Sequence, residues 1–287
     1  MGSWWGSRVG VLALLAAGVA GAVVQGLWAC GGASDGPPGA GEADAAELEE
    51  ASTPIEEAGP APPDAGADAK PSDPPKTFCA TRTPAPRFCD DFDDGELRDD
   101  WSVLTVLNGE ADLDPTTSTS APASFVVGTA PIGGTQSAHV HLRTTAGGAP
   151  TGHVVFSFDV LLEAVTFTQG VVAIATLDVA ANHSFTLYLR DGDADAPAAT
   201  LEENSPGSAT RHVLSALPAA GAWTRATIDV DLPAATATVL WGTETALDAA
   251  PILAGAAKDP TIRVGAVYVY GPAASFGAHF DNVTLDF

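Results

Sequence analysis

Acidic side chains alternate along one short segment, Glu110-Ala111-Asp112-Leu113-Asp114. In an extended strand, residues two positions apart point to the same face, so these three carboxylates would share one side. Paired carboxylates are the groups that hydrolyse glycosidic bonds, with Glu110 here as nucleophile and Asp114 as acid/base. Asn108-Gly109 before the segment and Pro115 after it favour a solvated turn instead.

Two histidines, His139 and His141, flank Val140 and would also point to one side of a strand. Together they could hold a metal, but a zinc site needs further ligands and no third is assignable. The polar side of a half-buried strand is the favoured interpretation. Residues 77–287 contain no Gly-x-Ser-x-Gly segment, so this part of the sequence offers no evident serine nucleophile. The one match, Gly32-Ala33-Ser34-Asp35-Gly36, lies in the stretch of low apolar content that precedes it.

A calcium loop is indicated by Asp191, Asp193 and Asp195, with Glu202 at the twelfth position. This matches the ligand spacing of an EF-hand loop. Ala196 occupies the sixth position, where the motif requires glycine, and the preceding segment is typical of a strand. The acidic tip of a hairpin is therefore the alternative.

Cys30 ends an apolar segment that runs from residue 9 to residue 29, after Arg8. Such a segment is typical of a signal peptide at 1–29. Leu27-Trp28-Ala29-Cys30 resembles the lipobox of bacterial lipoproteins, whose cysteine is acylated, although the family prefers a small residue at Trp28. We therefore expect an exported protein, anchored by lipid at Cys30 to the bacterial cell envelope, at the outer membrane or cell surface. Simple secretion and an uncleaved membrane helix are the alternatives.

Cys79 and Cys89 complete the three cysteines of the chain. They lie ten positions apart, and an exported protein meets conditions that permit disulfides. We expect the two to be bridged, with a pair of unlinked thiols as the alternative.

Composition divides the exported part in two. Residues 30–76 consist mainly of Ala, Gly, Pro, Asp and Glu, with Leu48 and Ile55 as their only large aliphatic residues. This stretch cannot bury enough apolar surface to offset its chain entropy, so we expect a disordered linker. Residues 77–287 are long enough to form one domain with a substantial core.

The charge of the chain limits its partners. The formal net charge is −24, and within residues 77–287 nine Lys and Arg residues against 25 Asp and Glu residues give −16. Phosphate binding requires a basic face, so this composition excludes nucleic acid. It also disfavours anionic membrane surfaces, leaving the lipid anchor as the membrane contact. Neutral glycans, cations and basic proteins remain open as partners.

Short alternating segments rich in Val, Thr, Phe and Leu recur through residues 77–287, and none shows sustained helical periodicity. This spacing predicts an all-β fold, an antiparallel β-sandwich or jelly roll of roughly eleven strands. The expected strands are 101–106, 124–127, 137–143, 153–162, 171–177, 184–189, 211–214, 223–230, 236–241, 262–270 and 279–285.

Four motifs appear in a characteristic order: Phe88-Cys89-Asp90-Asp91-Phe92-Asp93, Phe156-Ser157-Phe158-Asp159-Val160, Gly221-Ala222-Trp223 and His279-Phe280-Asp281-Asn282-Val283-Thr284-Leu285. Together they resemble the concanavalin A-like lectin/glucanase superfamily, including laminin G-like domains. The resemblance implies two antiparallel sheets, the concave one binding glycan. It also implies a structural calcium held by Asp91 or Asp93 with Asp281, unless these acids only cap the first and last strands. The superfamily's glucanases carry alternating acids on a central strand, which the segment 110–114 matches poorly.

Flat aromatic rings can cover the apolar face of a sugar. Tyr268 and Tyr270 alternate with Val267 and Val269, so burial of the valines would turn the tyrosines outward. We expect a non-catalytic domain that binds a glycan or another surface macromolecule, with these tyrosines as first candidates. A glycoside hydrolase or polysaccharide lyase of the same fold, or a structural or adhesive envelope protein, are the alternatives. The other candidate rings are Tyr188, Trp101, Trp223 and Trp241, of which Trp101 and Trp223 are expected in the core.

Overall fold

The computed structural model of the chain describes residues 77–97, 100–164, 170–191 and 197–287. The expected signal peptide, Cys30 and the linker up to residue 76 lie outside the described residues. Within these ranges the chain forms fifteen strands and one short helix, α1 (Phe78–Thr81). No helix among them has the length and apolar character needed to cross a membrane.

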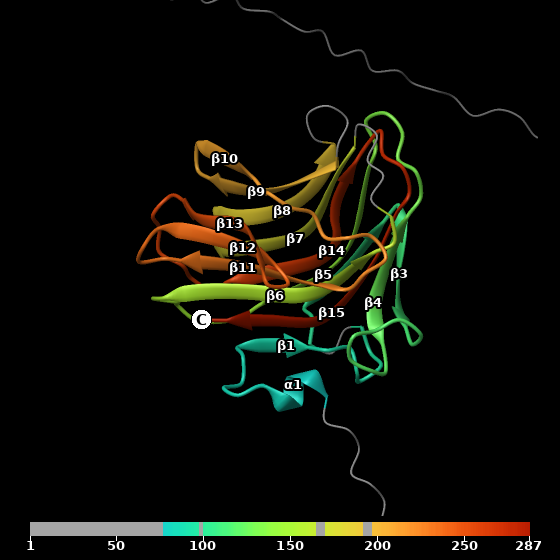
Figure 1. Cartoon of the computed structure of the whole chain (residues 1–287), viewed down its shortest axis with the longest axis horizontal. Coiled ribbons are helices and arrows are strands. Elements are labelled where there is room, and N and C mark those ends of the chain that lie inside the picture. The colour runs from blue at the N-terminus through green and yellow to red at the C-terminus, as the bar shows by residue number, and fades with distance from the viewer. Residues whose placement is uncertain (1–76, 98–99, 165–169, 192–196) are drawn as a thin grey trace, which may run out of the picture. The chain divides into compact units, whose positions relative to one another are not determined.

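The strands form two antiparallel sheets, as the alternating sequence pattern predicts (Figure 1). The eight-stranded sheet contains β1 (Phe88–Asp90), β3 (Gly109–Asp114), β4 (Ser124–Thr129), β6 (His153–Leu162), β11 (Thr224–Asp231), β12 (Thr236–Trp241), β13 (Glu244–Pro251) and β15 (Phe276–Asp286). Its order is β13-β12-β11-β6-β15-β4-β3, and β1 also pairs with β15.

The seven-stranded sheet contains β2 (Val103–Leu107), β5 (Ser137–Thr145), β7 (Val171–Ala180), β8 (His183–Asp191), β9 (Pro197–Ser205), β10 (Ser208–Val213) and β14 (Thr261–Tyr270). Its order is β10-β9-β8-β7-β14-β5-β2. The two sheets enclose one core because each strand buries alternate side chains. Three phenylalanines pack together in this core: the ring centroid of Phe280 lies 6.2 Å from that of Phe125 and 5.9 Å from that of Phe158.

One expectation from the sequence is wrong: the segment 109–114 is strand β3, not a solvated turn. Asn108, with a φ of 56°, and Gly109 carry the chain from β2 in one sheet to β3 in the other. A Cβ on Gly109 would lie 2.5 Å from the carbonyl oxygen of Gly128, so only glycine allows this close crossing. Strands β1, β9 and β13 were also not expected.

The N-terminal segment of the domain packs on the outward side of the eight-stranded sheet. The expected bridge between Cys79 and Cys89 is confirmed, with a Cα–Cα distance of 5.8 Å. It joins α1 to β1, and the backbone N–H of Cys79 also donates to the carboxylate of Asp91 at 2.7 Å. The guanidinium of Arg225, on β11, lies 5.3 Å from the ring centroid of Phe78. The segment is therefore fastened to β15 and β11 (Figure 1).

Arg225 also organises a polar network beneath this segment. It donates to the backbone oxygen of Asn282 at 2.7 Å, to the carboxylate of Asp159 at 3.3 Å and to the hydroxyl of Thr284 at 3.1 Å. Asp281 is fully buried beside it. The network holds the closing motif against β6 and β11, and its buried groups are paired, as a low-dielectric site requires.

Candidate functional site

All three tyrosines of the chain lie on the outward side of the seven-stranded sheet. Tyr268 on β14 is opposite Ala173 on β7, which in turn is opposite Tyr188 on β8. The rings of Tyr268 and Tyr270 are nearly parallel, at 11°, with centroids 6.1 Å apart, and Tyr270 is 39% exposed. We call the outward side of this sheet the tyrosine face. Sequence alternation placed Tyr268 and Tyr270 there, while Val269 is buried as expected.

Four arginines share the tyrosine face: Arg143 on β5, Arg190 on β8, Arg211 on β10 and Arg263 on β14. They are four of the nine basic residues in 77–287. Arg263 pairs with Asp178 at 2.9 Å, while Arg211 and Arg190 share Glu202 at 3.3 and 3.8 Å. Counting only the outward-pointing side chains that the structure describes, four arginines minus these two acids leave +2 on a face of a strongly acidic domain. Glu203, also on β9, is buried and pairs with His183.

Three buried polar atoms on the tyrosine face have no hydrogen-bond partner among the described residues: Nδ1 of His141, Nε of Arg190 and Oγ1 of Thr200. His141 and Thr200 are only 9% and 1% exposed. Buried polar atoms in folded proteins are normally paired with protein groups or ordered water. Burial, followed by the nearby Arg263, lowers the pKa of His141 to about 4, so its ring is neutral at pH 7.

His139 and His141 do share one side of β5, with ring centroids 6.5 Å apart. Nδ1 of His139 lies 2.9 Å from the backbone oxygen of Val267, and its ring lies 5.3 Å from that of Tyr268. Across the described ranges, no three His, Cys, Asp or Glu side chains are arranged to hold a metal ion. The pair therefore contributes to the surface around Tyr268.

The burial of the tryptophans differs in part from the expectation that Trp101 and Trp223 lie in the core. Trp101 is buried and donates from Nε1 to the carboxylate of Asp90, and Trp241 is buried and donates to the backbone oxygen of Ala216 at 3.0 Å. Trp223 was expected in the core, but it is only half-buried, on the outward side of the eight-stranded sheet. Its ring centroid lies 6.3 Å from that of His279. The position just before β11 gives it the same outward direction as Arg225.

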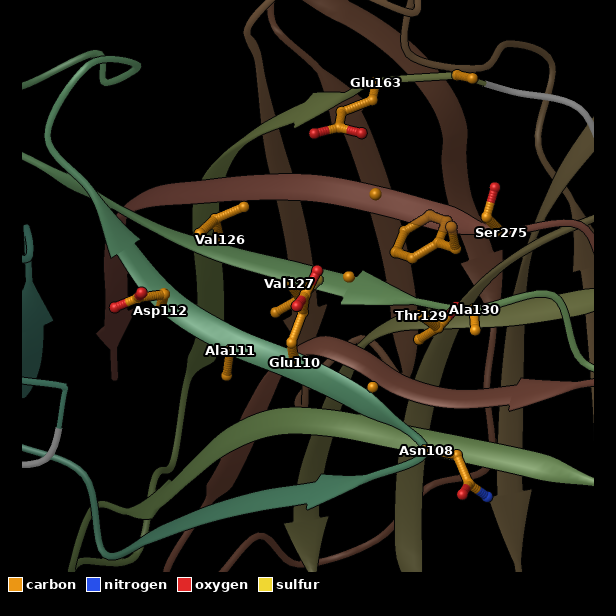
Figure 2. A pocket seen from close by; sticks show the side chains of 15 residues that line it. Asn108, Glu110, Ala111, Asp112, Val126, Val127, Thr129, Ala130, Glu163 and Ser275 are labelled. Carbon is orange, nitrogen blue, oxygen red and sulfur yellow. The ribbon is translucent and has the colours of Figure 1, made fainter. Parts of the chain in front are cut away.

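A second candidate site is a pocket of about 800 Å³ beside β3, β4 and β15, which we call the acidic pocket (Figure 2). Glu110 and Asp112 line it from β3, and Glu163, just after β6, lines it from the other side. Between them Gly128 of β4 is paired with Gly277 of β15. A Cβ on Gly128 would come within 3.0 Å of the Glu110 carboxylate, and one on Gly277 would collide with that of Glu163. The two carboxylates thus lie over a floor of paired glycines.

The partner expected for Glu110 was Asp114, and the structure gives Asp114 a different environment. Its carboxylate accepts from the backbone N–H and hydroxyl of Thr116 at 2.8 and 2.6 Å, and these bonds lower the pKa of Asp114. Buried His279 lies between Asp114 and Glu163, 3.6 Å from each. A carboxyl that is held ionised is poorly suited to act as an acid, whereas Glu163 faces Glu110 across the glycines. Sequence spacing gave no signal for Glu163, because it follows another strand.

The expected calcium ligands come together in part. The carboxylate oxygens of Asp93 are buried, and no residue in the described ranges forms a hydrogen bond with them. Burial, then the nearby charges of Asp91 and Asp281, raises the pKa of Asp93 to about 6. Asp281 is already engaged, since its two oxygens accept hydrogen bonds from Thr119, Ser120 and the backbone of Asn282. The orphaned oxygens of Asp93 fit a cation, whereas Asp281 has a hydrogen-bonding role.

The EF-hand-like alternative is not a single loop. Asp191 ends β8, and Asp193 and Asp195 lie outside the described residues. Glu202 lies within β9 opposite Thr186, five residues back from Asp191 along β8, and is ion-paired with Arg190 and Arg211. Its carboxylate is therefore already engaged by two guanidinium groups.

Comparison with known proteins adds evidence on the fold. No protein-family model and no curated protein matches the chain. Among solved structures, the "Cellulose induced protein, Cip1" superposes with a TM-score of 0.52 at 14% identity, covering 69% of this chain and 96% of that one. The alginate lyase Aly36B gives 0.42 at 8% identity, over 70% and 93%. The carbohydrate binding module CBM66 from Bacillus subtilis gives 0.39 at 9% identity, over 65% and 97%. The chain thus shares with Cip1 a two-sheet antiparallel β-sandwich of jelly-roll type.

Proposed function

We propose that this chain is a bacterial lipoprotein, anchored at Cys30, whose sandwich domain binds a glycan on the tyrosine face without chemically changing it. The observation that carries the proposal is the gathering of Tyr188, Tyr268 and Tyr270 on one side of one sheet. Flat rings flanked by polar groups are the usual means of binding sugars, because a ring covers their apolar face while polar atoms meet their hydroxyls.

A glycan array probed with residues 31–287, the expected mature chain without its lipid, tests glycan binding. Replacing Tyr268 or Tyr270 by Ala should weaken binding roughly 3- to 10-fold each, the loss expected for an aromatic contact. Trp223→Ala is the matched control, since it removes a partly exposed ring from the opposite sheet. Silence across the array, or a loss in the control that equals the loss in the tyrosine variants, would contradict binding at this face.

The lipid anchor is tested separately in a bacterial host. Mass spectrometry of the membrane-extracted protein should find an N-terminus at Cys30 that carries acyl chains. The Cys30→Ser variant should move to the soluble fraction, because membrane attachment by lipid depends on the burial of those chains. A wild-type protein that keeps residues 1–29, or one that lacks acyl chains, would contradict the anchor.

The acidic pocket supports glycoside hydrolysis as a second candidate function. Glu110 and Glu163 face each other over Gly128 and Gly277, an arrangement that leaves room for a sugar between two carboxylates. Release of reducing ends from polysaccharides should then fall by several orders of magnitude in both Glu110→Gln and Glu163→Gln. Asp112→Asn, which changes another acid of the same pocket, is the control. Equal turnover in all three variants would eliminate these residues as catalysts.

We also propose that Asp93, with Asp91, holds a structural calcium ion, whose charge would offset that of the two carboxylates. The support is the pair of buried, unpartnered oxygens on Asp93. Calorimetry should show a melting temperature that rises with added calcium and falls with a chelator, and an Asp93→Asn variant that no longer responds. A wild-type melting temperature unaffected by calcium would contradict the site.

A further inference from the structure

We propose that the tyrosine face selects an acidic glycan, a polymer whose sugar units carry carboxylate or sulfate groups. This inference rests on the proposed function, since it names the class of ligand for the same face. Net charge points the other way: a domain at −16 is expected to prefer neutral or cationic partners. What decides the matter is the position of the charges within the fold.

The balance of acids and arginines differs between the outward sides of the two sheets. Strand β3 alone places Glu110, Asp112 and Asp114 on the outward side of the eight-stranded sheet. Among the outward-pointing side chains described on the tyrosine face, four arginines stand against Asp178 and Glu202, because Glu203 of β9 is buried and paired with His183. A charged glycan approaching the domain therefore meets opposite local fields on its two sides, and charges within about 10 Å of each other at 0.1 M salt are not fully screened.

Two of the arginines are placed in direct cross-strand opposition. Arg143 on β5 and Arg263 on β14 are register partners. Like charges directly opposite each other destabilise a sheet. Asp178 forms an ion pair with Arg263 and also feels the charge of Arg143, so one acid stands against two arginines here. Arg143 is exposed and forms no ion pair with any residue that the structure describes. A ligand carboxylate or sulfate would neutralise this pair, and guanidinium groups bind such oxyanions through two parallel hydrogen bonds.

The unpartnered atoms lie beside these charges. His141, with its orphaned Nδ1, is two residues from Arg143 on the same side of β5. Arg190, with its orphaned Nε, lies next to the tyrosines, its guanidinium carbon 5.5 Å from the ring centroid of Tyr188. Burial, then Arg211, lowers the pKa of Arg190, which records the crowding of positive charge. His141 and Arg190 place further polar groups beside Arg143 and the tyrosines.

The cations occupy two positions along the face. Tyr268 and Arg263 are five residues apart on β14, which corresponds to roughly 15 Å in an extended strand. One end of the face thus offers Arg190 beside stacked rings, and the other offers Arg143 with Arg263. A chain that bears an acid at regular intervals could stack one sugar on a tyrosine while its acidic groups reach both cationic positions.

Binding of matched oligosaccharides by residues 31–287 tests the inference. The probes are oligogalacturonate for carboxylate, a chondroitin sulfate oligosaccharide for sulfate, and cellohexaose and chitohexaose as neutral chains. Calorimetry in 20 mM NaCl should give at least tenfold tighter binding for one or both acidic probes than for the neutral ones. The advantage should shrink in 500 mM NaCl, because salt screens exposed charges.

Arg143→Gln should abolish most of this preference without unfolding the domain, because its side chain has no ion pair with a described residue. Arg82→Gln, on the side of the eight-stranded sheet, makes the same change in charge and should keep the preference. Arg143→Lys keeps the charge but loses the planar guanidinium group, so its preference for acidic probes should lie between those of Arg143→Gln and Arg82→Gln. Tyr268→Ala should weaken binding to acidic and neutral probes alike.

The outcomes separate this inference from the function on which it rests. Tyrosine-dependent binding that is equally tight for neutral and acidic probes would overturn the selection of acid but leave glycan binding standing. Equal losses in Arg143→Gln and Arg82→Gln would also overturn it, since the effect would then follow net charge alone. The absence of binding to every probe, in a folded protein, would contradict both proposals.

Discussion

Breaking the Cys79–Cys89 disulfide should lower the free energy of unfolding by about 2.7 kcal/mol. The bridge spans a sequence separation of 10, and in the chain-entropy model a loop of this size is restricted in the unfolded chain by about 9 cal/mol/K. For the 211 residues from 77 to 287, an unfolding entropy of about 2.1 cal/mol/K per residue converts that loss to a fall of about 6 °C in melting temperature. The hydrogen bond from Cys79 to Asp91 remains in place, so the native state should change little.

The comparison is between wild type and the Cys79→Ser/Cys89→Ser variant, by urea unfolding and by calorimetry, with reduced wild type as a second sample. A Cys30→Ser protein is the control for the loss of a cysteine. A decrease in the free energy of unfolding below 1 kcal/mol would refute the reasoning, since the loop would then be restricted in the unfolded chain even without the bridge. A loss above 5 kcal/mol would also refute it, because native packing would then depend on the bridge.

Three further predictions concern the stability of the sandwich. Arg225→Ala should cost about 3–5 kcal/mol in urea unfolding, because it removes the cation paired with Asp159 and the donor to the backbone oxygen of Asn282; a loss under 1 kcal/mol would contradict the network. Burial raises the pKa of Asp90 to about 7, against the hydrogen bonds from Phe92 and Trp101. The folded state therefore holds this proton more tightly than the unfolded chain, so the free energy of unfolding should fall between pH 4 and pH 7, by at most about 4 kcal/mol. Asp90→Asn should flatten this decline, and an unchanged slope would contradict the assignment. Gly265→Ala should cost more than about 2 kcal/mol, because its φ is 127° and a Cβ would collide with the backbone oxygen of Val140. Gly133→Ala, where nothing lies within 4 Å, should change the melting temperature little, and equal effects of the two substitutions would refute the steric argument.

Alternation made the fold class predictable, because strands such as β11 and β12 bury every second residue against the opposite sheet. The same rule turned Tyr268 and Tyr270 outward. It failed for β3, where Asn108-Gly109 has the composition of a turn but carries the chain between sheets. It missed β13, whose buried pattern is interrupted by register shifts against β12.

The candidate sites could be predicted only in part, because they depend on the order of strands within each sheet. Tyr188 and Tyr268 are 80 positions apart, and they share a face because β7 separates β8 from β14. Glu163 comes near Glu110 only through the glycines of β4 and β15. Net charge, which sums over both sheets, concealed the arginines on one of them.

The place where the chain enters the sandwich has a consequence for how a membrane-held copy would work. Phe78 and the disulfide hold the first described residues of the domain against the eight-stranded sheet, on the opposite side from the three tyrosines. If Cys30 were anchored in a bilayer, the domain would be attached from the side opposite the tyrosine face, and that face would remain open to a glycan. Several anchored copies could therefore bind one long polysaccharide chain, and their individually weak contacts would combine into a high overall affinity.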